Sequence, residues 1–144
     1  MAPTPTEEVK VVEKVEPPPK KKFNRLDYMF AKETGKELTK LPGAVDGNPF
    51  NIRFLEDCTI NIFDHSATIN VDKCKNCTMF IGPIKSSIFI RDCENCVIHV
   101  ACQQFRCRDF SNSTIYLYAM NDPVIEASSG LKFAPYNLMY AGLD

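Results

Sequence analysis

A spacing of 19 residues recurs through the middle of the chain, and this repeat restricts the possible folds more than any other feature. Cys58, Cys77 and Cys96 are 19 residues apart, and Ser113 follows Cys96 after 17. A repeat of about 20 residues is typical of a solenoid. Apolar residues keep the same spacing in four further columns, which are Leu55, Cys74, Cys93 and Phe110; Ile60, Met79, Ile98 and Ile115; Ile62, Ile81, Val100 and Leu117; and Ile69, Ile88, Cys107 and Val124.

Residues inside each repeat alternate with a period of two, which indicates β-strand. A further column lies between two of the apolar ones and is predicted to point outward; it consists of Asn61, Phe80, His99 and Tyr116. The sequence therefore predicts an all-β fold, a parallel β-helix with three short strands per coil of about 19 residues. Each coil would lie about 4.8 Å above the previous one. Roughly four coils fit between Phe50 and Pro135.

One column of the repeat predicts a sharp corner. Asp57, Asn76, Asn95 and Asn112 each stand immediately before the Cys58 column. Asp and Asn tolerate the left-handed backbone region better than most other residues. We therefore expect one tight bend at this position of every coil.

The composition divides the chain into three parts. Residues 1–22 hold five of the ten prolines and end in three lysines, so they are predicted to form a disordered Pro/Lys-rich tail. Residues 23–49 contain apolar residues and two turn signals, and are predicted to form a strap or linker that could cover the open end of the following domain. The β-helix is predicted for residues 50–144, short at its C-terminal end.

Charge and hydropathy exclude several classes of function. The chain has 17 basic and 18 acidic residues, which argues against nucleic acid as a partner. It contains no apolar run of membrane-spanning length and no hydrophobic signal core. Ala2 in place of glycine excludes N-myristoylation, so we expect no direct lipid anchor. Seven cysteines without a secretory signal indicate reduced thiols in a cytoplasmic protein.

The cysteine spacing has a second interpretation. Cys74, Cys77, Cys93 and Cys96 form two CxxC pairs, as in a four-cysteine zinc ribbon. Two observations oppose zinc: Cys58 belongs to the same column without a paired cysteine at Leu55, and the apolar flanks repeat with the thiols. Because free cysteine packs as a small apolar residue, we expect buried thiols and no metal site. No Gly-rich phosphate loop or paired-carboxylate site indicates a cofactor either.

The segment 101–109 concentrates polar chemistry on one predicted strand. Arg106 and Arg108 are two residues apart and would project from the same face, while Phe105 and Cys107 would turn the other way. Two cations on a rigid strand, with amide side chains before them, suit an anionic or phosphate-bearing partner. A solvated strand edge that keeps the sheet soluble is the alternative.

Five motifs together resemble the tubulin-binding cofactor C domain family, and in particular its retinitis pigmentosa 2 branch. The similar region covers about residues 27–144. The family has a right-handed parallel β-helix, in agreement with the repeat. The motifs are Leu41-Pro42-Gly43, residues 63–68 (FDHSAT), residues 82–85 (GPIK), residues 101–106 (ACQQFR) and residues 123–126 (PVIE).

The resemblance implies activation of GTP hydrolysis by a partner. It places an arginine finger on Arg106, a supporting glutamine on Gln104 and a partner-contacting carboxylate on Glu126. Partner contacts are further expected at Gln103, Phe105 and Arg108, although Arg108 could instead pair with a neighbouring carboxylate. In the 19-residue register Arg106 aligns with Thr68 and Ser87, and Arg108 with Asn70 and Phe89, so both arginines should face outward.

Two functions follow as hypotheses. The first is a GTPase-activating protein for an Arf-like small GTPase in its GTP state, or for tubulin, with GTP and Mg²⁺ carried by the partner and no substrate pocket of its own. The second is a non-catalytic ciliary or microtubule-associated scaffold that docks through the β-helix, within a larger ciliary assembly. Either implies a cytoplasmic protein at the cytoskeleton, cilium or basal body. The chain ends at Asp144, where relatives continue, so we expect a terminal coil that is incompletely capped or covered by a partner.

Overall fold

The computed structural model describes residues 24–138, and the tail predicted for residues 1–22 lies outside this range. Eleven strands and one short 3-10 turn make up the described part. They are η1 (Arg25–Tyr28), β1 (Met29–Thr34), β2 (Glu37–Lys40), β3 (Phe50–Glu56), β4 (Thr59–Ile62), β5 (Ile69–Asp72), β6 (Thr78–Ile81), β7 (Ser87–Glu94), β8 (Val97–Cys102), β9 (Gln104–Ala119), β10 (Val124–Glu126) and β11 (Ser129–Pro135).

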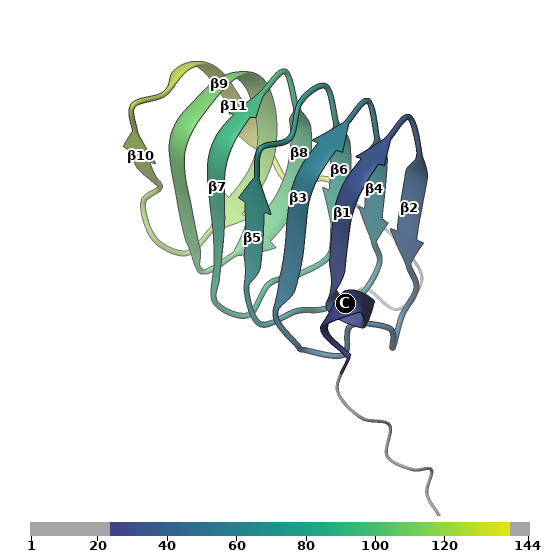
Figure 1. Ribbon diagram of the computed structural model, residues 1–144. Helices are drawn as coiled ribbons and strands as arrows, with labels where there is room; N and C mark the ends of the chain where they lie inside the picture. Colours follow the sequence, from purple (N-terminus) through teal and green to yellow (C-terminus); the bar gives the residue numbers. More distant parts are fainter. Residues whose placement is uncertain (1–23, 139–144) are drawn as a thin grey trace, which may run out of the picture.

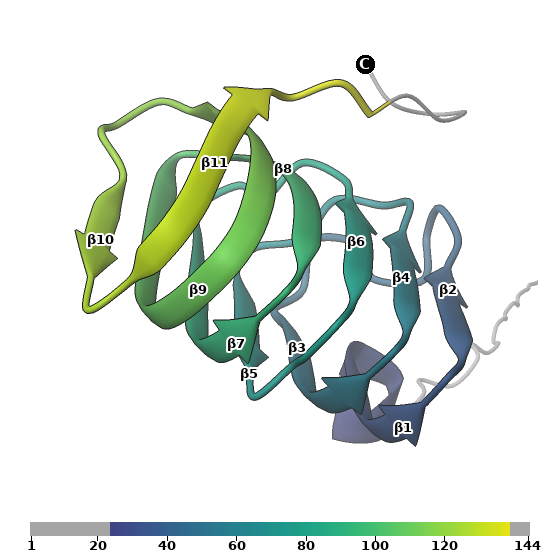
Figure 2. The same ribbon diagram turned by 90° about the horizontal axis from the view of Figure 1, so that it is seen from above.

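All strand pairings are parallel, and they wind into a solenoid of about six turns (Figures 1 and 2). The strands follow the order β1-β3-β5-β7-β9-β8-β6-β4-β2, with β10 and β11 paired to the two halves of β9. Strands β1, β3, β5, β7 and β10 therefore form one side and β2, β4, β6, β8 and β11 another, while β9 bends from the first side to the second. The predicted parallel β-helix is confirmed.

A short third side lies between the two long sides, and its residues are also paired in parallel through the bridges of Lys75 with Glu56 and Glu94. At the opposite turn Ser66 forms a bridge with Ile84, and the Lys85 N–H donates to the Ser66 carbonyl at 2.8 Å. The three short paired segments predicted for each coil are thus present.

The solenoid begins earlier than expected. Strand β1 pairs with β3 and β2 with β4, and Phe30 and Leu38 pack against the core. Residues 29–40 thus form the first coil, and the boundary predicted at Phe50 is wrong. The loop that follows β2 lengthens the first repeat, and the buried carboxylate of Asp64 holds this loop by accepting backbone N–H bonds from Val45 at 2.9 Å and Asp46 at 2.6 Å.

Two columns of left-handed residues turn the coils. The predicted corner is confirmed, because Asp57, Asn76, Asn95 and Asn112 have φ between 52° and 57°. Gly35 and Gly130 complete this column at the ends of the solenoid. The second column was not predicted, because most of its members are not residues that favour this region: Lys32, Phe54, Lys73, Asp92, Asp109 and Ala127, with φ from 48° to 59°.

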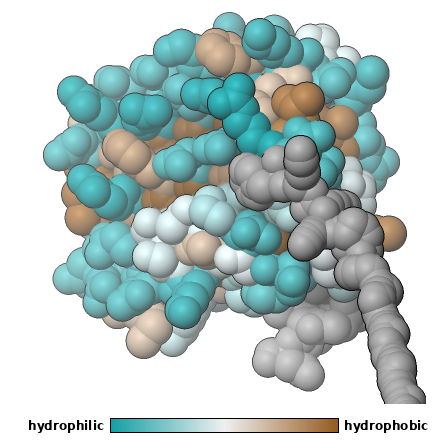
Figure 3. All heavy atoms as spheres, turned by 60° about the horizontal axis from the view of Figure 1, so that its bottom comes forward, coloured by the Kyte–Doolittle hydropathy of each residue, from teal (hydrophilic) through white to brown (hydrophobic). Residues whose placement is uncertain are grey.

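The interior consists of stacked apolar columns, as predicted. The columns headed by Leu55, Cys58 and Ile60 are buried throughout, and all seven cysteines are buried free thiols. Burial raises the pKa of the Cys102 thiol to about 11. Among residues 24–138 no group of three or more His, Cys, Asp or Glu side chains is placed to hold a metal ion. Outward positions are mainly hydrophilic in the view of Figure 3.

One predicted column has the wrong register. Ile88 pairs with Phe105, Ile90 with Cys107, and Arg106 with Val124. The reason is a shorter corner: four residues lie between Val100 and Phe105, whereas six lie between Ile81 and Ile88. The repeat therefore contracts by two residues at Gln103, before Arg106, and not between Cys107 and Val124 as the predicted column required. Val124 consequently lies in an outward column, and Ile125 takes the core position beside Cys107.

The last coil leaves apolar side chains partly uncovered, because Ile125 and Phe133 are nearly half exposed.

The segment after β11 packs on the outside of the solenoid. Residues 136–138 run back across β8 and β6 (Figure 2), where the Tyr136 hydroxyl donates to the Ile81 carbonyl at 3.1 Å. There Asn137 contacts His99, which stacks between Phe80 and Tyr116 with ring centroids 4.6 and 4.4 Å away. The predicted outward column is thus confirmed for Phe80, His99 and Tyr116, whereas Asn61 is buried and donates to the side chains of Glu37 and Thr39. No described helix is long and apolar enough to cross a membrane.

Candidate functional site

The candidate site lies on the outer face of β7, β9 and β10. Parallel pairing stacks Phe89, Arg106 and Val124 into one outward column. A second column two residues further along the strands contains Arg91, Arg108 and Glu126. Because residues two apart in a strand share a face, the two columns form a single surface patch, which we call the arginine face.

The neighbours of both arginines differ from those expected. Arg106 pairs with Phe89 instead of Ser87, and Arg108 pairs with Arg91 instead of Phe89. The contraction at Gln103 shifts the register by two residues. A shift of two leaves each side chain on the same face, so Arg106 and Arg108 still point outward and are exposed.

The three arginines of this face have different partners. Arg91 lies 3.6 Å from the carboxylate of Asp72, and Arg108 Nε lies 4.0 Å from Asp109 Oδ2. Within the described part of the chain, Arg106 has no carboxylate within 4.0 Å, and its guanidinium carbon instead lies 5.3 Å from the centre of the Phe89 ring. Arg106 is therefore the arginine of this face that forms no ion pair with a described carboxylate.

Gln104 fixes the start of β9 with its side chain. Its amide nitrogen donates to the Asp122 carbonyl at 3.2 Å and to the Phe105 carbonyl at 3.3 Å. These bonds tie the strand that carries Arg106 to the loop that leads into β10. Gln103 is exposed at the corner itself, where its backbone N–H donates to the Ser86 carbonyl at 2.9 Å.

Phe105 is not part of the exposed site. Its side chain is fully buried and packs edge-on against Phe133, with ring centroids 5.9 Å apart. Strand alternation turns it inward when Arg106 turns outward. The expected partner contact through Phe105 is therefore wrong, and the residue belongs to the core.

Glu126 joins the arginine face from the last coil. It is exposed and is the direct strand partner of Arg108. The Arg108 guanidinium nevertheless approaches Asp109, and with side chains 61% and 55% exposed this pair contributes little to stability. Arg108 and Glu126 thus offer one cationic and one anionic group beside Arg106.

Several residues of the site were missed by sequence reasoning. Phe89, Arg91 and Val124 surround Arg106, yet their position depends on the two-residue contraction. An aromatic residue at an outward strand position, followed two residues later by arginine, was the available signal.

A mostly apolar groove of about 190 Å³ adjoins Gln103 and is lined in part by the exposed side chains of Tyr118 and Met120.

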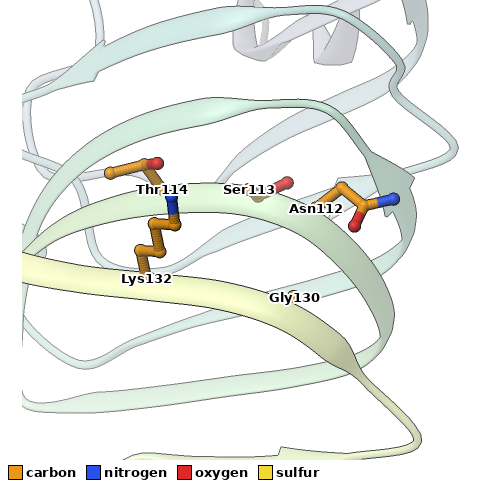
Figure 4. A pocket seen from close by; sticks show the side chains of 5 residues that line it. All are labelled: Asn112, Ser113, Thr114, Gly130 and Lys132. Carbon is orange, nitrogen blue, oxygen red and sulfur yellow. The ribbon is translucent and has the colours of Figure 1, made fainter.

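A larger hollow of about 340 Å³ lies between β9 and β11 and is separate from the predicted residues (Figure 4). It is lined by Asn112, Ser113, Thr114, Gly130 and Lys132. A Cβ atom at Gly130 would lie 2.5 Å from Asn112 Oδ1. Gly130 and Asn112 thus approach each other closely at one end of the hollow, and none of the expected site residues lines it.

Comparison with known proteins identifies relatives across this region. The family model for tubulin binding cofactor C matches residues 47–144. Protein XRP2 of Homo sapiens is 49% identical over 124 residues, which cover 86% of this chain and 35% of the relative. Protein XRP2 of Gallus gallus is 50% identical over 122 residues, covering 85% and 34%. The chain thus spans about a third of these relatives' length.

More distant similarities agree with the fold. The tubulin-specific chaperone C of Bos taurus is 31% identical over 90 residues, covering 62% of this chain and 26% of the relative. The crystal structure of a cyclase-associated protein from Cryptosporidium parvum superimposes with a TM-score of 0.68 at 17% identity, over 82% of this chain and 76% of that one. The latter similarity concerns the fold alone.

Proposed function

The chain belongs to the tubulin binding cofactor C family, and on this basis we propose that it activates GTP hydrolysis by a partner protein, into whose nucleotide site it inserts Arg106. An Arf-like small GTPase in its GTP state is the first candidate partner, as the similarity to the retinitis pigmentosa 2 branch implies. Tubulin is the second, since relatives are named as tubulin-specific chaperones.

The unpaired guanidinium of Arg106 is the observation that carries this proposal. Transfer of the γ-phosphoryl group of GTP to water spreads negative charge over the phosphoryl oxygens. An arginine inserted from a second protein stabilises that charge and can accelerate hydrolysis by about 10³–10⁵-fold. Because no carboxylate of the described residues neutralises Arg106, its charge and its N–H donors are available to phosphate oxygens.

The surrounding solenoid supports this role by holding the arginine in place. Arg106 lies in β9 between β7 and β10, so both neighbouring strands fix its backbone. Gln104 ties the beginning of that strand to the next loop. A preorganised cation avoids reorganisation during the reaction, which is how such electrostatic groups act most strongly.

The remaining residues of the arginine face would orient the partner. Arg108 and Glu126 are exposed and oppositely charged, and Gln103 lies at the adjoining corner. Complementary charges at the rim of an interface set orientation and association rate more than affinity. The partner would bind GTP and Mg²⁺ in its own site. Such a partner would place the protein at the cytoskeleton, cilium or basal body.

Single-turnover GTP hydrolysis tests the proposal directly. GTP-loaded Arf-like GTPases and GTP-bound tubulin would each be mixed with a saturating excess of this protein. We expect at least one of them to hydrolyse GTP faster by orders of magnitude. Binding to a GTP-loaded partner without faster hydrolysis would instead support the scaffold function and reject the catalytic one.

A further inference from the structure

We propose that Phe89 is a positioning residue for Arg106, which holds the guanidinium on its ring and thereby presents it to a phosphate group. The contact between the two residues is independent of the proposed function. Its consequence for hydrolysis rests on that function. The two are therefore tested by separate measurements.

The geometry brings these side chains together. Phe89 and Arg106 are direct partners in the pairing of β7 with β9, and both project outward. The guanidinium carbon lies 5.3 Å from the ring centroid, within the range in which a cation is attracted to an aromatic face. In the two preceding coils the same column holds Asn51 and Asn70, so among these coils only that of β7 places a ring beneath the arginine.

An aromatic ring suits this task better than a carboxylate. A carboxylate would accept N–H bonds from the guanidinium and offset its charge. The ring attracts the cation through its quadrupole and occupies no N–H donor. Phe89 can therefore restrict the side chain of Arg106 while all five guanidinium donors remain available to phosphate oxygens.

Asp72 and Arg91 complete the arrangement. The Arg91 guanidinium carbon also lies 5.3 Å from the centre of the Phe89 ring. Left alone, this second cation would repel Arg106. The Asp72 carboxylate, 3.6 Å from Arg91, offsets that charge, so the ring can hold Arg106 without a strong opposing field.

Nuclear magnetic resonance of the free protein tests the contact. The ring current of Phe89 should shift the Arg106 side-chain protons upfield in the wild type and in Phe89→Tyr. The shift should vanish in Phe89→Leu. In Asn70→Ala, which changes the same column one coil away, it should persist. Arg106 protons at ordinary positions in the wild type would overturn the proposal, whether or not any partner is activated.

Kinetics test the consequence with the partner that the wild-type protein activates. Phe89→Leu should lower the maximal stimulated rate about two- to fivefold, the loss of one exposed cation–π contact. The concentration giving half-maximal stimulation should stay unchanged, and Phe89→Tyr should restore the rate. A maximal rate in Phe89→Leu equal to that of the wild type would overturn the positioning role. A wild type that activates no partner rejects the proposed function, and the proton shifts then decide the position of Arg106.

Discussion

Arg106 is the strand partner of Phe89, and its guanidinium carbon lies 5.3 Å from the centre of that ring. This relationship results from a corner that has four residues where the preceding coil has six. With a regular 19-residue repeat, Arg106 would have stood beside Ser87. The contraction therefore decides which side chain supports the exposed cation.

A charge in a stacked column should be strongly destabilising. Cys77 is buried and has Cys58 and Cys96 at the same position of the neighbouring coils. Cys77→Asp would place a carboxylate there without water or a counter-charge, so we expect a loss of several kcal/mol in the free energy of unfolding.

Urea denaturation monitored by circular dichroism measures this loss. Asn70→Asp introduces the same side chain at an exposed outward position, and it should change the stability by no more than about 0.5 kcal/mol. Equal stability of the two variants would show that the column faces solvent.

The corner glycines allow a matched comparison. Gly35 and Gly130 have φ of 66° and 67°, but a Cβ at Gly35 would meet nothing within 4 Å. A Cβ at Gly130 would lie 2.5 Å from Asn112 Oδ1 and 3.2 Å from its backbone nitrogen. Both alanine variants carry the cost of the left-handed backbone, about 1 kcal/mol.

Thermal and urea denaturation should therefore rank the variants. We expect Gly130→Ala to be less stable than Gly35→Ala, because it adds a steric clash to the same backbone strain. A Gly35→Ala protein that is the less stable of the two would contradict the packing of the last corner.

Asp64 should make stability depend on pH. Burial raises the pKa of this carboxyl, but backbone N–H bonds from Asp46 and Val45 outweigh it and lower the pKa below 3.8. A lowered folded-state pKa means that the ionised form stabilises the fold. That contribution is fully present above the unfolded-state pKa near 4 and is lost as pH falls through the folded-state value.

Substitution by Asn isolates this contribution. At pH 7, Asp64→Asn should cost about 1–2 kcal/mol, since charge-assisted hydrogen bonds become neutral ones. The difference from wild type should shrink in unfolding experiments below about pH 4. A difference that is constant from pH 7 to pH 3 would show that ionised Asp64 does not hold the loop after β2.

The sequence predicted the interior well, because stacking places equivalent residues of successive coils above one another. The Cys58 and Ile60 columns are buried as expected. The first coil was missed since 22 residues separate Gly35 from Asp57, and the loop before Phe50 hides the repeat. A shift of two residues leaves every side chain of a strand on the same face, so the alternation of apolar and polar residues looks the same before and after it. The column that contained Cys107 therefore could not show where the contraction lies.

The sequence was sufficient to predict which side chains of the candidate site face outward, but not which residues they contact. Alternation was sufficient to turn Arg106 and Arg108 outward. The same rule turns Phe105 inward, and its expected partner contact conflicted with that rule. The ring beneath Arg106 depends on register, and the pairing of Arg91 with Asp72 depends on side-chain conformation. Neither is encoded in a local pattern.

The proposed function requires Arg106 to act on the transferring phosphoryl group of a partner, and the Arg106→Ala variant tests this role. Because the side chain is exposed, its loss should change stability by no more than about 0.5 kcal/mol. Arg53→Ala is the matched control, since Arg53 is also exposed and outward on β3, several coils away. Arg106→Lys keeps the charge but removes the planar fork of donors.

The decisive measurement is the rate of stimulated GTP hydrolysis at saturating concentrations of each variant. Arg106→Ala should lose about 10³-fold or more of the stimulation while it still binds the GTP-loaded partner, because a finger acts mainly on the transition state. Arg106→Lys should recover only part of the rate, and Arg53→Ala should match the wild type. A rate for Arg106→Ala equal to that of the wild type would contradict the account.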